Sequence, residues 1–251
     1  MSLRPRSPVV RALQAQIDAR QTAAPDIAER WPTGLATLDR ALLGGLVRGA
    51  LNELLVSEPG TGIVEALLPA LHRRPAGAET PRLLAWIHPF KTPYPPALAQ
   101  AGDGALGRWL IVRPPGPEDH LWALEQALRS KACDAVVAHL GDVPDMVLRR
   151  LQLAAQEGRA LGLFFRPGSV AAKASPAAVR LLVRPQPADA ARRRRVAIEC
   201  LRCRGATYVP PLFLEWDVDS LDERETAASF ERALDTGEAF GRRPAARAHG
   251  A

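Results

Sequence analysis

A glycine-containing turn between an apolar run and a helix-like run is the first place where this sequence could do chemistry. The phosphate-loop pattern G-x-x-x-x-G-K-[ST] supplies amides that surround phosphates, a lysine that neutralises them and a hydroxyl that holds magnesium. Here the corresponding eight residues read SEPGTGIV, in which Gly60 and Gly62 favour a turn. Ser57 stands at the first glycine of the pattern, Ile63 at the lysine and Val64 at the hydroxyl residue. The sequence therefore predicts a degenerate phosphate loop that binds no nucleotide cofactor.

The cysteines and histidines form no complete metal or nucleophile pattern. Cys200 and Cys203 have a spacing found in zinc sites, but a tetrahedral site needs two more ligands, and Cys133 has no second ligand beside it. Residues three apart on a regular strand also point to opposite faces. The 5 histidines are scattered, without a recognisable nucleophile setting. We predict no catalytic residue and no metal site.

The densest basic run precedes a strand-like segment and leaves two interpretations open. It consists of Arg192, Arg193, Arg194 and Arg195, and Arg202 and Arg204 follow it. One hairpin could present these guanidinium groups to a DNA backbone or to an acidic partner. The run could equally be a solvated turn. The net charge of +6 adds little, because the excess is almost all arginine.

Strand-like and helix-like segments alternate through the first two thirds of the chain. Short apolar runs indicate strands at 50–56, 82–87, 109–112, 135–138 and 161–165, and helical spacing indicates helices at 35–42, 63–71, 119–130 and 144–158. Such alternation predicts an α/β fold with a mainly parallel sheet flanked by helices. The proline-rich stretch HPFKTPYPP, residues 88–96, is predicted to be a non-helical loop.

The pattern changes after the fifth strand-like run. Segments 179–183, 195–203 and 212–216 are strand-like, without helices between them, and predict a C-terminal antiparallel extension of the sheet. We expect an N-terminal helix and linker at residues 1–30, one core at 31–218 and a flexible tail at 219–251.

Both predicted ends of the chain carry small apolar stripes. Val9, Leu13 and Ile17 follow helical spacing in the N-terminal segment, and Phe230 and Leu234 lie four apart in the polar C-terminal tail. We expect Phe230 and Leu234 to contact a partner, with the N-terminal stripe as the competing contact site.

Residues 33–49, which read TGLATLDRALLGGLVRG, resemble the entry segment of RecA-type ATPase cores, and the strand-like run with Glu53 follows them. This resemblance implies a RecA-like core. In that family the second strand ends near a catalytic glutamate and the fourth in an aspartate that supports magnesium. Here residues 86–90 offer no carboxylate, and His139 or a neighbour ends the fourth run. The resemblance thus implies a RecA-like fold without ATP hydrolysis.

Further stretches resemble the ImuA family of translesion-synthesis accessory proteins, which groups with the SulA cell-division inhibitors. They are residues 83–87, 93–98, 121–130, 148–155 and 162–167. The most specific stretch is WALEQALRS, residues 122–130. The resemblance implies an SOS-induced, non-catalytic accessory protein. Its implied partners are an ImuB-like inactive homologue of Y-family polymerases, RecA and, indirectly, an error-prone replicative-type polymerase.

Two other functions stay open at this point. One is a SulA-like cell-division inhibitor that caps a filament-forming protein, and the other is a residual ATPase with an unusual pocket. No apolar run approaches the roughly 18 residues that cross a bilayer, so we expect no membrane association and a cytoplasmic location. Direct DNA contact remains a possibility.

The aromatic residues divide into expected core and expected surface. Tryptophans in strand-like or helical segments are predicted to be buried; these are Trp86, Trp109, Trp122 and Trp216. Trp31 and Tyr94 fall in predicted loops, where an aromatic side chain could anchor a partner.

Overall fold

The computed structural model describes most of the predicted core. The described residues are 29–57, 61–72, 82–88, 93, 95–99, 105–187, 193–206, 208–217 and 223–224. The expected N-terminal helix and the tail residues Phe230 and Leu234 lie outside these ranges.

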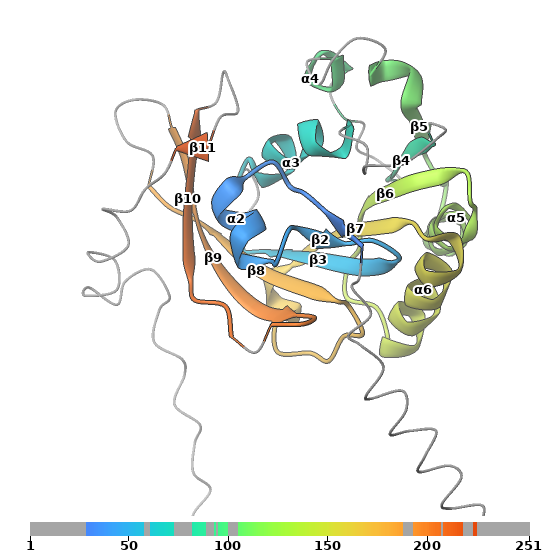
Figure 1. Ribbon diagram of the computed structural model, residues 1–251. Coiled ribbons are helices and arrows are strands. Elements are labelled where there is room, and N and C mark those ends of the chain that lie inside the picture. Colours follow the sequence, from blue (N-terminus) through green and yellow to red (C-terminus); the bar gives the residue numbers. More distant parts are fainter. Residues whose placement is uncertain are drawn as a thin grey trace, which may run out of the picture.

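Within the described residues, nine strands form one sheet in the order β11-β10-β9-β8-β3-β7-β6-β4-β5 (Figure 1). They are β3 (Ala50–Val56), β4 (Leu83–Ile87), β5 (Trp109–Val112), β6 (Cys133–His139), β7 (Leu161–Pro167), β8 (Val179–Pro185), β9 (Arg193–Cys203), β10 (Leu212–Asp217) and β11 (Glu223–Arg224). Neighbours from β8 to β5 pair in parallel, and β8 to β11 pair antiparallel. The predicted α/β class, the mainly parallel sheet and its antiparallel extension are confirmed.

The strand order differs from the common dinucleotide-binding arrangement. Numbered along the chain, the parallel strands from β5 to β8 lie in the order 3-2-4-5-1-6, whereas the Rossmann order is 3-2-1-4-5-6. Strand β3 therefore pairs with β7 and β8 rather than with β4. Both of its faces are buried as well, which explains why it reads as an apolar run with little alternation.

Helices cover the two faces of the sheet. They are α2 (Ala36–Ala41), α3 (Ile63–His72), α4 (Pro95–Ala99), α5 (Pro117–Arg129) and α6 (Asp145–Gly158), with 3₁₀ turns at Ala105–Arg108 and Gly168–Val170. Figure 1 shows α5 and α6 side by side at one side of the sheet. Leu124, Leu128, Leu148 and Leu151 of these helices pack against β4, β6 and β7.

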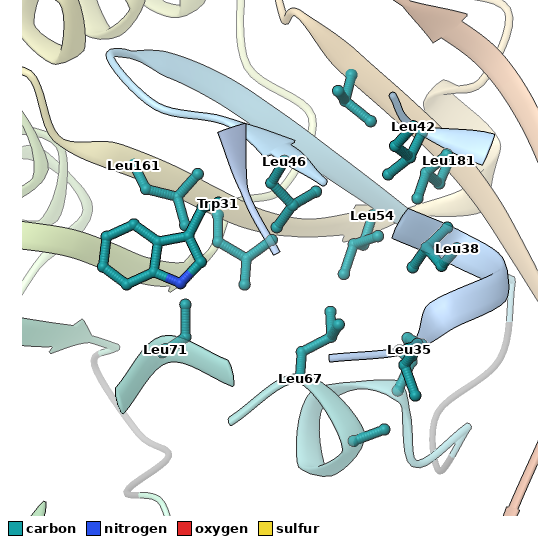
Figure 2. Packing of buried hydrophobic residues seen from close by; sticks show 14 of the residues in the cluster. Trp31, Leu35, Leu38, Leu42, Leu46, Leu54, Leu67, Leu71, Leu161 and Leu181 are labelled. Atoms are coloured by element: carbon teal, nitrogen blue, oxygen red, sulfur yellow. The ribbon is translucent and has the colours of Figure 1, made fainter. Parts of the chain in front are cut away.

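On the other face, α2 and α3 meet the sheet through a larger apolar cluster (Figure 2). A two-stranded sheet of β1 (Arg30–Trp31) and β2 (Leu46–Val47) belongs to this layer. Sequence analysis did not predict that sheet. Trp31, expected in a loop where an aromatic side chain could anchor a partner, lies in β1 instead. It is 1% exposed, and its indole Nε1 donates to the Ala70 carbonyl at 2.9 Å. The contact lies 39 residues away in the chain, so no local pattern reveals it.

Two further expectations need correction. Helix α4 begins at Pro95, inside the stretch predicted to be non-helical, because prolines fit a first helical turn whose amides need no intrahelical acceptor. Trp122, predicted to be buried, is 64% exposed on α5. Its neighbours Leu121 and Ala123 are partly buried, so the helix turns the indole outward.

The cysteine argument from strand geometry is also wrong. The pairing of β8 with β9 shifts by one residue, so that Leu181 faces Cys200 while Arg180 faces Arg202. This irregularity inserts an extra residue, and both Cys200 and Cys203 consequently pack against the apolar cluster. Burial, and secondarily the nearby Cys203, raise the pKa of Cys200 to about 11. The Cys200 thiol is therefore protonated at neutral pH.

We predict that the pKa of the Cys200 thiol lies well above that of an unperturbed thiol. Alkylation by iodoacetamide, followed by peptide mass spectrometry across a pH series, should give an apparent pKa of about 11 for Cys200 in the folded protein. The urea-unfolded protein should titrate near the ordinary 9.0. A folded-state midpoint at or below 9.0 would contradict the described burial.

Gly45 allows the closest backbone approach in the β1–β2 layer. Its φ is +124°, and a Cβ there would lie 2.1 Å from the carbonyl oxygen of Trp31. Gly44 has φ +109°, but its Cβ would meet only side-chain carbons of Arg30, the nearest at 3.6 Å. Comparing alanine substitutions at these two glycines therefore distinguishes the effect of backbone strain from the effect of steric overlap.

Gly45→Ala should destabilise the protein more than Gly44→Ala does. The strain of a positive φ costs both variants about 1–3 kcal/mol, and overlap with the Trp31 backbone should add at least about 2 kcal/mol for Gly45→Ala alone. Urea unfolding followed by tryptophan fluorescence measures the difference. Equal losses for the two variants would disprove the close approach.

Candidate functional site

Both described ends of the predicted degenerate phosphate loop are held by the sheet. At its start, the Ser57 amide donates to the Val183 carbonyl of β8 at 3.2 Å, and the Ser57 hydroxyl reaches the same oxygen at 3.3 Å. A Cβ on Gly168 would come within 3.0 Å of the Ser57 Cα. Gly60 lies outside the described residues. The first position of the loop is thus fixed to β8.

At the other end, Gly62 leads into α3 with φ +73°, a conformation that favours glycine. A Cβ on Gly62 would lie 3.2 Å from the Trp216 ring of β10 and 3.5 Å from side-chain carbons of Arg194. The antiparallel extension therefore packs directly against this part of the loop.

The side chain at the lysine position points into the core. Ile63 has 0% exposure and belongs to the same apolar cluster as Trp216, while Val64 packs against that cluster. In a functional phosphate loop this position must reach the phosphates with a charged group. Here it contributes to the stability of the core instead.

Aromatic and imidazole rings occupy the carboxyl ends of β4, β6 and β7. The ring centroids of His88 and His139 are 4.9 Å apart, and those of His139 and Phe165 are 5.3 Å apart. Trp86 lies 6.1 Å from His139 by the same measure. The resemblance to RecA-type cores placed acidic groups at the ends of the first two of these strands. The described ends carry imidazole and aromatic side chains.

The first carboxylate after β6, that of Asp142, forms an ion pair with a lysine. Asp142 lies three residues beyond His139, is exposed, and forms an ion pair with Lys173. The described residues also contain no group of three or more potential metal ligands. The described residues at this edge of the sheet therefore include no carboxylate placed to support magnesium.

A neutral histidine joins α3 to the edge strand β5. The Trp109 indole Nε1 donates to Nε2 of His72 at 2.9 Å. Burial lowers the pKa of His72, and the nearby Arg108 lowers it further. Because Nε2 accepts a hydrogen bond, it must be unprotonated, which agrees with the lowered pKa.

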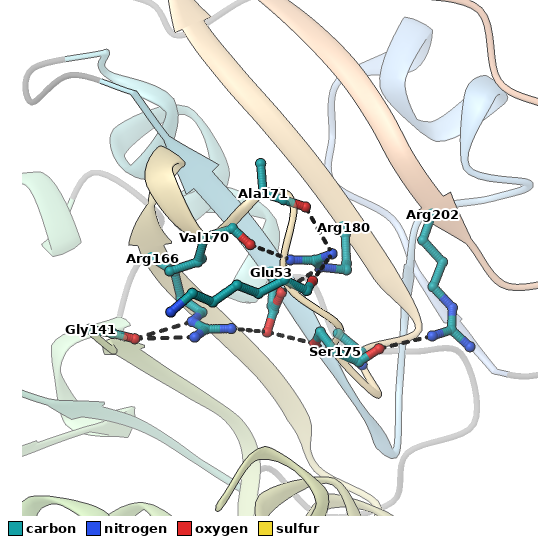
Figure 3. A network of polar contacts seen from close by, with 10 residues as sticks. Glu53, Gly141, Arg166, Val170, Ala171, Ser175, Arg180 and Arg202 are labelled. Carbon is teal, nitrogen blue, oxygen red and sulfur yellow. Dashed lines mark hydrogen bonds and ion pairs between the residues drawn. The ribbon is translucent and has the colours of Figure 1, made fainter. Parts of the chain in front are cut away.

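A buried ion-pair network lies within the sheet beside β3 (Figure 3). Glu53 is 0% exposed, and its two carboxylate oxygens accept from Arg166 at 2.7 Å and from Arg180 at 2.8 Å. The Ser175 hydroxyl donates to the same carboxylate at 2.8 Å. A buried carboxylate is stable only when paired in this way.

The remaining donors of the network hold the segment after β7. Arg180 donates to the carbonyls of Val170, Ala171 and Lys173, and Arg166 donates to the carbonyl of Gly141. Every described link runs to a carboxylate, hydroxyl or main-chain oxygen of this chain. The network therefore positions residues 168–175 over the sheet.

The sequence alone did not reveal this network. Glu53 and Arg180 each interrupt an apolar strand-like run, and Arg166 directly follows one, which is unusual for a charged residue. These three charged residues in or beside apolar runs were the available signal. Only the register of β3 with β7 and β8 shows that the three side chains meet.

The arginine run of the antiparallel extension is divided between two faces. β9 begins at Arg193, two residues earlier than predicted, and Arg192 lies outside the described residues. Arg194 packs on Gly62, whereas Arg195 donates to Glu215 at 2.6 Å. Adjacent strand residues point to opposite faces, so Arg194 and Arg195 cannot share one flat contact surface.

Comparison with known proteins does not assign a family. No protein-family model matches the sequence, and no curated protein matches it at a significant level. Among the described helices, none is long and apolar enough to span a bilayer. Any function must therefore be argued from the residues themselves.

We predict that Glu53→Gln strongly destabilises the protein. The amide keeps the shape of the side chain but leaves two buried guanidinium groups without a counter-charge, which costs about 3–5 kcal/mol. Glu199→Gln is the matched control, because the Arg184–Glu199 pair is partly exposed and joins its atoms at 3.4 Å. That change should cost less than about 1 kcal/mol. Similar unfolding midpoints in urea for both variants would refute the role of Glu53.

Proposed function

We propose that this protein is a non-catalytic accessory protein of SOS-induced translesion DNA synthesis. Its core is RecA-like, and it acts in the cytoplasm by contacts with other proteins. Its proposed partners are an ImuB-like inactive polymerase homologue and RecA, with an error-prone replicative-type polymerase engaged indirectly. The assignment to the ImuA family comes from the sequence stretches described above.

One observation carries the non-catalytic part of the proposal: Ile63 is completely buried at the position of the phosphate-binding lysine. A lysine at this position would place an ammonium group in an apolar cluster, at a large free-energy cost. Together with the histidine and aromatic rings at the strand ends, this supports a core that has exchanged nucleotide chemistry for packing.

The surface supports action through protein contacts. A protein without catalytic groups must act through what it binds, and the described surface carries large apolar side chains. Trp122, Met146 and Tyr208 are exposed by 64%, 81% and 77%. Tryptophan and tyrosine are enriched among the residues that dominate binding energy at protein interfaces.

We predict that Mg-ATP does not stabilise the folded protein. A ligand that binds only the native state stabilises it by mass action and so raises the melting temperature. At a ligand concentration of 100 times Kd, the free energy of unfolding increases by about 2.7 kcal/mol. Differential scanning fluorimetry with millimolar Mg-ATP should therefore give the same Tm as magnesium with sodium chloride at matched ionic strength. A saturable rise in Tm with Mg-ATP, or an ATPase activity that co-purifies with the protein, would overturn the non-catalytic assignment.

Deletion of the gene should reduce damage-induced mutation frequency without slowing unstressed growth. Complementation by the wild-type gene should restore induced mutagenesis. Filamentous growth on overexpression, combined with normal induced mutagenesis in the deletion strain, would contradict the proposal and favour the division-inhibitor function instead.

A further inference from the structure

The described sheet ends on one side at an apolar strand. β5 is the last strand in that direction and pairs, within the described residues, with β4 (Figure 1). Its four residues read WLIV, and each is at least partly exposed, whereas β3, β6 and β7 are almost entirely buried. Leu110 is 42% exposed, and Leu106, in the 3₁₀ turn directly before the strand, is 48% exposed. The edge strand is thus both apolar and exposed.

Edge strands of soluble proteins usually carry a feature that prevents pairing with another chain. Such features are charged side chains, proline, a β-bulge, a covering segment or a very short strand. At the opposite end of the described sheet, β11 has two residues, both charged. β5 contains no charge and no proline, and its pairing with β4 keeps a regular register over four residues. This contrast indicates a strand that pairs with another chain.

The main-chain groups of β5 point alternately towards β4 and away from it. The carbonyl of Val112 accepts from the His88 amide at 3.1 Å, so the main-chain groups of Val112 point towards β4. Because these directions alternate along a parallel strand, those of Leu110 also point towards β4. Trp109 and Ile111 direct their amide and carbonyl groups to the outer edge. That edge therefore offers a donor and an acceptor at each of these two residues.

The side chains of β5 alternate between the two faces of the sheet. Trp109 and Ile111 pack against the apolar cluster on the α3 side, and Val112 packs against the cluster on the α5 side. Leu110 therefore lies on the α5 side, where it is the most exposed residue of the strand. A strand added outside β5 would cover it, because facing residues of neighbouring strands lie only about 5 Å apart.

The outer edge of β5 is complementary to itself. In an antiparallel pair around a two-fold axis, residues with outward main-chain groups must face one another. With Ile111 on the axis, Ile111 faces its own copy. Trp109 then faces Arg113, the residue directly after β5, and Leu110 faces Val112. A guanidinium group beside an indole ring is a favourable contact, and Leu110 gains an apolar neighbour.

Other positions of the two-fold axis fit less well. A shift of half a residue sets outward main-chain groups opposite inward ones and can bring Arg108 against Arg113, two like charges. A full step towards the C-terminus sets Trp109 opposite Pro115, which has no amide. A full step the other way sets Arg113 opposite Gly107, which belongs to the 3₁₀ turn. The axis at Ile111 therefore pairs the most groups.

We propose that two copies of this chain pair antiparallel through their β5 edges, with Ile111 on the two-fold axis, so that the two sheets become continuous. A second copy is favoured over a different protein because this edge supplies the complement of each of its own outward groups. Two four-residue strands form a small contact beside the roughly 1,200 Å² of a stable interface, so we expect a transient dimer with a Kd of ~10–100 µM. This inference does not depend on the proposed role in translesion synthesis.

Sedimentation velocity of the full-length protein tests the pairing, at ~5 to ~500 µM on either side of that Kd. The sedimentation coefficient should rise from the monomer value towards the dimer value. Ile111→Pro should keep the protein monomeric, because it removes the outward amide on the axis and none of the amides that point towards β4. Ile111→Val is the matched control, since it keeps the amide and should dimerise like the natural chain. A monomer at every concentration, or a dimer of the Ile111→Pro variant, would overturn the proposal.

Disulfide cross-linking at position 111 tests the position of the axis without a proline. Facing residues of a hydrogen-bonded antiparallel pair have Cα atoms about 5.5 Å apart, a distance that a disulfide spans. Ile111→Cys should therefore form an intermolecular disulfide under mild oxidation. Leu106→Cys is the control: the side chain there is more exposed, but it should cross-link no more than the natural chain with its 3 cysteines. Equal cross-linking of the two variants would contradict the proposed axis.

Discussion

Two adjacent polar residues in the buried central strand each hold a segment of the chain against one face of the sheet. Asn52 and Glu53 point to opposite faces of β3, and both are 0% exposed. The Asn52 amide bonds both backbone groups of Val47 and the carbonyls of Ala50 and Gly162, which fixes β2 over one face. Glu53 fixes residues 168–175 over the other through its two arginines. The strand can carry polar groups because each one is paired.

This arrangement explains which parts of the fold the sequence could predict. Strands such as β3, β6 and β7 appear as short apolar runs because burial of both faces requires them. The β1–β2 sheet does not appear, because two-residue strands have no period and depend on contacts such as that of Trp31 with Ala70. The local pattern of apolar residues indicates which segments are buried. It does not indicate which distant segments pair with each other.

The candidate site shows the same division. The missing lysine and hydroxyl of the phosphate loop could be read directly, because the pattern fixes their positions. The sequence could not show that Ile63 joins the core or that the rings of His88 and His139 meet edge to face at neighbouring strand ends. Arg166 and Arg180 resemble surface residues until the strand register places them beside Glu53. A network built from three strands is visible only in three dimensions.

The packing around Ile63 has one physical consequence. Because Ile63, Gly62 and Trp216 pack together, the start of α3 joins the parallel sheet to its antiparallel extension. A lysine at position 63 would therefore bury a charge in an apolar cluster. Within the described residues, large apolar side chains stay exposed elsewhere, among them Trp122 on α5, Met146 on α6 and Tyr208.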